Sequence, residues 1–356
     1  MVKYRLATED DYQRINKFHN WFYESNRTIE QFYWEFHNGP FGKSIYVIAE
    51  DGDKIVGTNC VIPIELIGSQ NQIILSGKSE DTLVDPTYRG RRVFYNIYKF
   101  LFEKCKENGI KVIWGFTGAR GPFKKLGFSI PFDHQQSLAV NNIFKSFKYL
   151  SGLNKKNNTL DRLKILGVCI YSKIKLMGNL RNQISNEYDV SEDKDINEGI
   201  DQLIRSNLNT LESSFAINQN SNFQKWRIYQ NPNYNKVYTY GFYDQQNLLK
   251  GLIILNSDTN MIAYICQSAF DPNIREYEAV QMIRYVTKKM FKKGIVLIRN
   301  WHFDHNVLNK TEAILYRKAN HTHLKRGVGF VWKELDTLEI EPELFYLSRI
   351  STQGVT

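Results

Sequence analysis

Three arginines gather in one turn of the sequence, within the segment LVDPTYRGRRVF at residues 83–94. An apolar run that predicts a strand leads into this turn, and a predicted helix follows it. The backbone N–H groups that begin a helix have no partners inside it, so they form a site for anions. Arg89, Arg91 and Arg92 add full positive charges beside those groups. We therefore expect this turn to hold a pyrophosphate.

Two common phosphate-binding motifs do not describe this turn. It lacks the Gly-Lys-Ser/Thr of a Walker loop, and it lacks the three glycines of the dinucleotide fingerprint. The alternative interpretation is a turn whose arginines are simply solvated. The ordered run of strand, turn, helix and strand around it favours the binding site.

The segment resembles the acyl-CoA-binding motif of the GNAT superfamily of N-acyltransferases, in which a loop Arg/Gln-x-x-Gly-x-Gly/Ala cradles the pyrophosphate of CoA. Here the loop reads RGRRVF from Arg89 to Phe94. Arg92 replaces a glycine of the usual pattern and brings a Cβ to a place where the backbone normally approaches the phosphate closely. The likeness continues in KVIWGFT (residues 111–117) and PFKKLGF (residues 122–128), which look like the next strand and the short elements that close the fold.

The resemblance implies a set of cofactor-binding residues. Backbone groups near Leu83 and Val84 would bind the pantetheine amides and the developing oxyanion. The residues around the pyrophosphate would be Arg89, Gly90, Arg91, Arg92, Val93 and Phe94. Thr117 stands where relatives commonly carry an asparagine that touches the cofactor. Lys124 could reach a CoA phosphate, although a solvated helix face explains it equally well.

Direct acyl transfer to an amine also needs a group that removes the ammonium proton. Glu80 and Asp81 lie just before the loop, on opposite faces of the predicted strand. Asp81 is the first candidate and Glu80 the second, and the alternative is a solvated or salt-bridged carboxylate. His134 is a third candidate because an imidazole suits proton transfer near neutral pH, although a surface or core histidine is the alternative.

The chain repeats itself at an offset close to 192 residues. Trp34 and Pro40 match Trp226 and Pro232, and the block at 105–114 matches the block at 290–299. Matching hairpins lie between these blocks. The repeat predicts two tandem GNAT-like domains of mixed α/β class, each with a mostly antiparallel mixed sheet flanked by helices. The second copy of the loop, NIREY at 273–277, has no glycine and carries an acid, so we expect it to have lost the CoA site.

We expect the N-terminal GNAT domain with the acyl-CoA site at 1–140, a basic helical linker at 141–187, and the C-terminal domain, an acceptor wall, at 188–356. From residue 141 to 181 this segment holds seven lysines and one acid, Asp161. A helix packed on both domains with its lysines in water is our prediction, and a membrane-surface helix is the alternative.

Composition limits the remaining classes. The 356 residues carry a net charge of +10, which favours an anionic partner such as a nucleotide or CoA. We expect no stable membrane insertion and a cytoplasmic protein, since the N-terminus lacks a secretory apolar core and the four cysteines have no paired spacing. The histidine pairs 302/305 and 321/323 lack the other ligands of a metal site, so we expect no metal.

The order of modules resembles bacterial tandem-GNAT sugar N-acyltransferases. The resemblance implies transfer of an acetyl or 3-hydroxybutyryl group from CoA to the amine of a nucleotide-linked amino deoxysugar, with a dTDP-linked 3-amino-3,6-dideoxyhexose preferred and no nucleic acid as partner. One alternative is an aminoacyl transferase of the peptidoglycan-bridge type, which lacks a CoA loop. Another is a non-catalytic nucleotide- or membrane-binding module. The oligomeric state stays open.

Overall fold

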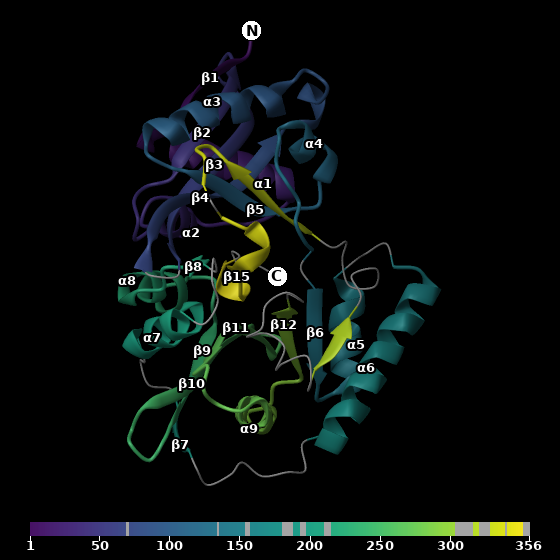
Figure 1. Cartoon of the computed structure of the whole chain (residues 1–356). Coiled ribbons are helices and arrows are strands. Elements are labelled where there is room, and N and C mark those ends of the chain that lie inside the picture. Colours follow the sequence, from purple (N-terminus) through teal and green to yellow (C-terminus); the bar gives the residue numbers. More distant parts are fainter. Residues whose placement is uncertain are drawn as a thin grey trace.

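A computed structural model describes residues 1–68, 71–133, 135–153, 157–179, 188–192, 197–209, 215–302, 316–319, 328–338 and 340–351. The chain forms two α/β units, one above the other in Figure 1, each built on one sheet with helices against it. This architecture confirms the predicted mixed α/β class with two units, each built on a mixed sheet.

The first sheet has the strand order β1-β2-β3-β4-β5-β14, with β8 beside β3 and β15 beside β8. Its pairs are antiparallel apart from β4–β5 and β8–β15. The elements that build this unit from the first part of the chain are β1 (Lys3–Leu6), α1 (Tyr12–Tyr23), α2 (Ile29–Phe36), β2 (Ile45–Asp51), β3 (Lys54–Gly68), β4 (Ile73–Val84), α3 (Val93–Glu107), β5 (Val112–Thr117) and α4 (Arg120–Lys125).

The second sheet has the order β13-β6-β12-β11-β10-β9-β7, with β11–β12 as its parallel pair. The remaining elements of the chain are β6 (Gln135–Val140), α5 (Ile143–Gly152), α6 (Thr159–Asn179), β7 (Asp189–Glu192), α7 (Asn197–Leu208), β8 (Phe215–Ile217), α8 (Ser221–Gln224), β9 (Lys236–Tyr243), β10 (Leu249–Ser257), β11 (Ile262–Phe270), α9 (Glu276–Lys292), β12 (Leu297–His302), β13 (Arg317–Ala319), β14 (Gly329–Glu334) and β15 (Phe345–Tyr346).

The two parts of the chain exchange strands, and β8 and β15 from the second part also join the first sheet. β6 follows the first unit in the chain but pairs with β12 and β13 in the second sheet, whereas β14 leaves the second unit to pair with β5. Figure 1 shows β14 in the upper unit and β6 in the lower one. The predicted division at residues 140 and 187 stays a prediction, and strand pairing crosses it in both directions.

The helix α3 begins directly after the basic turn, and its apolar residues recur on one face. Val93, Ile97, Leu101 and Cys105 are all buried on this stripe and pack on β2 and β3. Gly109, at φ +73, terminates the helix in the left-handed conformation that glycine adopts readily. The strand–turn–helix unit predicted from the sequence therefore places the turn between Val84 and the first turn of α3.

The basic segment after β6 forms the helices α5 and α6, which pack on each other, and α6 also packs on β6. Its buried residues join an apolar cluster under the second sheet, among them Leu150, Ile165 and Cys169. Within the described ranges, no helix combines the length and the apolar character needed to cross a bilayer.

Candidate active site

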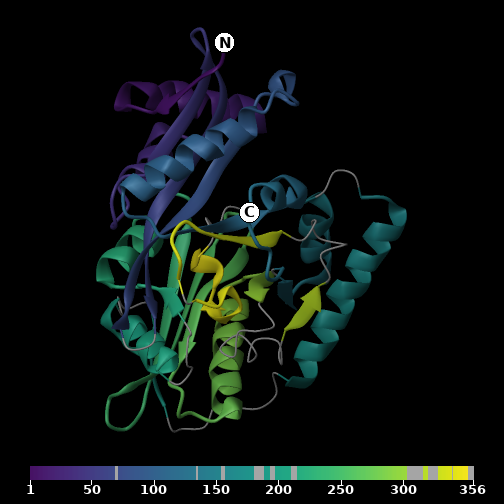
Figure 2. The same cartoon turned by 45° about the horizontal axis from the view of Figure 1, so that its top comes forward.

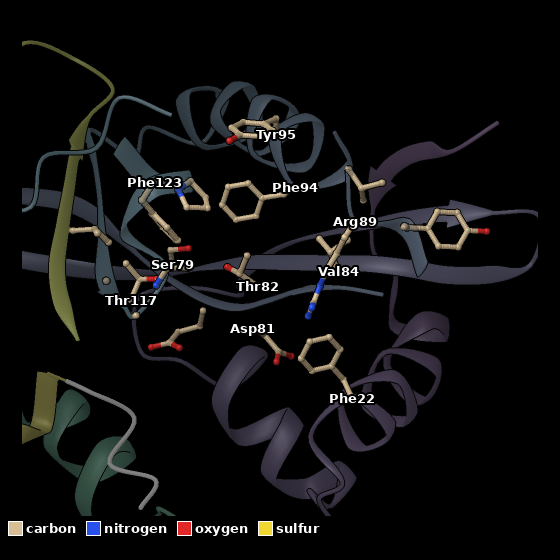
Figure 3. Close-up of a pocket in the computed structure, with 18 of the residues that line it drawn as sticks. Phe22, Ser79, Asp81, Thr82, Val84, Arg89, Phe94, Tyr95, Thr117 and Phe123 are labelled. Atoms are coloured by element: carbon tan, nitrogen blue, oxygen red, sulfur yellow. The ribbon is translucent and has the colours of Figure 1, made fainter. Parts of the chain in front are cut away.

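A cavity of about 640 Å³ opens where two neighbouring strands of the first sheet separate. Parallel pairing of β4 with β5 runs over Ser76–Lys78 opposite Val112–Trp114 and then ends. Beyond this point, residues 79–82 of β4 and 115–117 of β5 line the cavity. Figure 3 shows Phe94 and Phe123 around it on the side of α3 and Phe22 on the side of α1. Such a cleft has the size of a small-molecule site.

A β-bulge in β4 shapes the floor of this cavity. Between the pairs Thr58–Leu83 and Cys60–Glu80, β4 has two residues where β3 has only Asn59. Asp81 takes the left-handed conformation there, with φ at 51°, and its carbonyl accepts a hydrogen bond from the Thr58 hydroxyl at 2.8 Å. A bulge interrupts strand alternation and re-aims side chains.

The bulge corrects the predicted orientation of the two carboxylates. Regular alternation would place Glu80 and Asp81 on opposite faces. The residues on either side of them, Ser79 and Thr82, both reach the Tyr98 hydroxyl, at 2.9 Å and 3.2 Å, so the alternation is interrupted between them. The left-handed residue at position 81 is the physical reason, because it breaks the two-residue period of the strand.

Asp81 is buried, and both of its carboxylate oxygens accept hydrogen bonds. Its carboxylate accepts hydrogen bonds from His19 Nδ1 at 2.6 Å, Tyr46 Oη at 2.5 Å and Arg27 Nη2 at 3.1 Å. Burial alone would raise the pKa of Asp81, but the charge of Arg27 and the hydrogen bonds from His19 and Tyr46 lower it to about 2. Asp81 is therefore a fixed negative charge that ties β4 to α1 and to the start of α2.

Glu80 has a more open position. Its side chain is 22% exposed and lines the cavity, and one carboxylate oxygen lies 2.6 Å from the ammonium of Lys78. Lys78 is buried, and burial lowers its pKa even though Glu80 acts in the opposite direction. Behind this pair lies the carboxyl of Glu35, whose pKa is raised to about 8, mainly by burial and then by the charge of Glu80.

The basic turn forms the other end of the cavity. Gly90 and Arg92 both have positive φ, at 82° and 60°. The first hydrogen bond inside α3 is donated by Asn96 to the carbonyl of Arg92 at 3.0 Å, so the N–H groups of residues 93–95 are those left over at a helix start. Arg89 and Arg92 line the cavity beside this helix end. These groups can bind a diphosphate.

The structure gathers most of the predicted cofactor residues. Those that line the cavity are Val84, Arg89, Gly90, Arg92, Val93, Phe94 and Thr117. The remaining three lie elsewhere: Leu83 is buried in the core, Arg91 stacks on the Tyr88 ring at 4.8 Å, and Lys124 is exposed on α4. His134 lies outside the described residues.

Several site residues were not predicted from the sequence. His19 and Arg27 hold Asp81 although they lie more than 50 positions away, and Val331 of the exchanged strand β14 contributes to the cavity wall. Phe22 and Tyr23, at the end of α1, close the side next to Asp81. Only the tertiary fold brings these residues together, and no spacing in the sequence indicates it.

The equivalent helix start in the second unit is already capped. The backbone N–H of Arg275 donates to the Glu278 carboxylate at 2.7 Å, and the Arg275 guanidinium donates to the same carboxylate at 2.9 Å. Glu278 thus occupies this helix start with a negative charge, which would repel a pyrophosphate.

Comparison with known proteins agrees with this geometry. Residues 3–130 match the family model described as an acetyltransferase (GNAT) domain. No curated protein has a sequence that matches the chain. In fold, the chain is similar to a GCN5-related N-acetyltransferase from Anabaena variabilis, with TM-score 0.63 and 12% identity over 94% of this chain and 73% of that one.

Two further structures share the whole architecture. A tandem GNAT protein from the clavulanic acid biosynthesis pathway has TM-score 0.58 and 10% identity over 95% of this chain and 100% of that one. The N-myristoyltransferase of Saccharomyces cerevisiae, bound to myristoyl-CoA, has TM-score 0.57 and 12% identity over 93% and 82%. Residues 3–130 thus match a GNAT acetyltransferase domain, and the fold of the whole chain is that of a tandem GNAT protein.

Proposed function

We propose that the chain transfers an acyl group from acyl-CoA to the amine of a small molecule, and that the cavity of the first unit binds the acyl-CoA. One observation carries this proposal: a single cavity extends from the separated strands β4 and β5 to the helix start beside Arg89. The diphosphate would lie at the helix start and the pantetheine arm between the strands. The thioester would then lie near the bulge.

The reaction needs one nucleophile and one proton transfer. The neutral amine forms a C–N bond with the thioester carbonyl, the C–S bond breaks, and the proton lost by the amine balances the proton gained by the CoA thiolate. Backbone N–H groups left out of the ladder around the bulge would stabilise the oxyanion.

We assign the proton acceptor to Glu80. Asp81, the first candidate from the sequence, is held by three donors and has a pKa of about 2, so it is a weak base, and we give it a positioning role. Glu80 lines the same cavity and retains exposure. Its partner Lys78 is buried and also interacts electrostatically with Glu35.

The acceptor class that we propose is a nucleotide-linked amino deoxysugar, with acetyl-CoA or 3-hydroxybutyryl-CoA as donor. The net charge of +10 suits a doubly anionic nucleotide. We place the reaction in the cytoplasm, with which four buried free cysteines agree.

The test is acceptor-dependent thiol release. Each acyl-CoA is mixed with the protein and a panel of dTDP- and UDP-linked amino sugars, simple polyamines and amino acids. Thiol release that depends on a nucleotide-linked amino sugar, and that is at least tenfold slower in Glu80→Gln, supports the proposal. If acyl-CoA binds but a polyamine or amino acid is the only acceptor used, the acyltransferase assignment stands and the sugar class is rejected. Lack of acyl-CoA binding would reject the site itself.

A further inference from the structure

The helix α6 has two apolar faces, and only one of them is covered. The inner face includes Ile165, Cys169 and Leu176, which are fully buried against the second unit. The exposed face carries its own apolar side chains, and Leu163, Ile174 and Met177 are 60%, 63% and 60% exposed. The full set of large exposed apolar residues on this helix is Leu160, Leu163, Ile170, Tyr171, Ile174 and Met177.

These six residues form one continuous stripe. At 3.6 residues per turn they lie within an arc of about 120°, opposite the buried face, and the stripe is roughly 26 Å long. Gly167, also exposed, lies in the same arc and leaves it unbroken. Figures 1 and 2 show α6 at the outer edge of the molecule in both views.

Basic residues flank the stripe on both sides. Lys164 follows it in one direction around the helix and Arg162 in the other, and both are exposed. Lys175 and Lys173 lie on the same two sides, but they are half-buried and donate to the carbonyl of Tyr316 and to Asn141 Oδ1. From residue 141 to 179 the chain has eight basic residues and a single acid, Asp161. The neighbouring helix α5 adds Phe144, which is 85% exposed, together with the exposed Lys145 and Lys148.

We infer that α6 binds the surface of an anionic lipid bilayer. An apolar stripe between two rows of basic side chains is the arrangement of a helix that lies in a membrane interface, with apolar groups at the acyl boundary and ammonium groups among the lipid phosphates. The helix lies along the membrane and does not cross it. No residue that lines the acyl-CoA cavity belongs to α5 or α6, so the inference is independent of the proposed reaction.

The charges disfavour a second copy of this chain as the partner that covers the exposed apolar stripe of α6. Two α6 helices packed stripe to stripe would bring the basic rows of both copies together, with only the two Asp161 carboxylates to balance them. A bilayer that contains acidic lipids supplies the negative charge that a second copy lacks.

The test is co-sedimentation of the whole protein with vesicles of phosphatidylcholine alone and with vesicles that contain 30% phosphatidylglycerol. We expect binding to the anionic vesicles, at least tenfold weaker binding to the neutral ones, and weakening of anionic binding by salt. The double variant Leu163→Ser with Ile174→Ser should lose at least tenfold in affinity. Its control is Ile73→Ser with Leu248→Ser, which removes two exposed apolar side chains from other elements.

A second pair of variants tests the charges. Arg162→Gln with Lys164→Gln should weaken binding to anionic vesicles. The control, Lys99→Gln with Lys106→Gln on α3, should weaken this binding less. All four variants should keep CoA binding and the wild-type melting temperature, because the changed side chains are exposed. Lack of wild-type binding to anionic vesicles would overturn the inference. The inference would also be overturned if the α6 variants bound anionic vesicles as tightly as the wild type does. A lipid-free dimer that these variants dissociate would overturn it as well.

Discussion

Trp34 and Trp226 donate hydrogen bonds to each other's backbone. The indole nitrogen of Trp34 lies 2.8 Å from the carbonyl of Trp226, and the indole nitrogen of Trp226 lies 2.7 Å from the carbonyl of Trp34. The rings stack with centroids 5.5 Å apart. The two residues are 192 positions apart, which is the offset of the sequence repeat, so equivalent residues of the two halves meet directly.

Replacing either tryptophan by phenylalanine removes a buried donor and leaves a carbonyl unsatisfied. We expect Trp34→Phe and Trp226→Phe each to lower the free energy of unfolding by about 1–3 kcal/mol. The double variant should differ from the sum of the two by more than about 0.5 kcal/mol, because the residues are in contact. Urea unfolding of the four proteins measures this coupling. Strict additivity would show that the reciprocal contact is not a cooperative unit.

The first two arginines of the basic turn should behave differently. Arg89 lines the cavity, whereas Arg91 stacks on Tyr88, whose hydroxyl donates to Asp51 at 2.9 Å. We expect Arg89→Ala to raise the KM for acyl-CoA about tenfold, since a hydrogen bond to a charged group contributes about 1.5 kcal/mol. Arg91→Ala should change it less than threefold. Steady-state kinetics with varied acyl-CoA measures both KM values. A larger effect of Arg91→Ala than of Arg89→Ala would contradict the different positions assigned to the two arginines.

Arg92 occupies a backbone conformation that favours glycine. An L-residue at φ near 60° is less stable there by about 1–2 kcal/mol. Arg92→Gly relieves this strain but increases the freedom of the unfolded chain, so we expect a net gain in stability of about 0.5 kcal/mol. The same variant should bind acyl-CoA more weakly because a cavity charge is lost. Arg91→Gly, at a neighbouring residue with negative φ, is the control and should lower the melting temperature.

Asp81 links stability to pH. Its pKa falls from an ordinary value near 3.9 to about 2, so its contribution to stability is complete above pH 4 and is lost as the pH falls towards 2. At pH 7, Asp81→Asn should lose about 3 kcal/mol, because Arg27 stays buried without its anion. The difference from wild type should shrink between pH 4 and pH 2, as measured by urea unfolding.

The control for this series is Asp133→Asn. Asp133 is paired with Arg120, but both side chains are more than 40% exposed, so the change should lower stability by less than about 1 kcal/mol. A difference between Asp81→Asn and wild type that stayed constant down to pH 2 would contradict the assigned ionisation of Asp81.

The local part of the site was predictable from the sequence, and the tertiary part was not. The arginine–glycine turn and the stripe from Val93 to Cys105 are short-range patterns, so the strand–turn–helix unit could be predicted. The repeat likewise indicated the tandem fold. The bulge at Asp81 depends on how two strands fit together, and strand alternation alone gave the wrong orientation for Glu80 and Asp81.

The exchange of β6 and β14 shows the same limit. Each strand has an ordinary length and pattern, and nothing in its residues indicates which sheet it joins. His19 also carries no local signal, because only the packing of α1 against β4 brings its ring to Asp81.

The most direct test of the central claim is a crystal structure of the protein with acetyl-CoA. We predict the diphosphate at the start of α3 beside Arg89 and Arg92, and the thioester between β4 and β5 within reach of Glu80. Density for CoA at the start of α9, where Glu278 already caps the helix, or at any site outside the cavity of the first unit, would contradict this account.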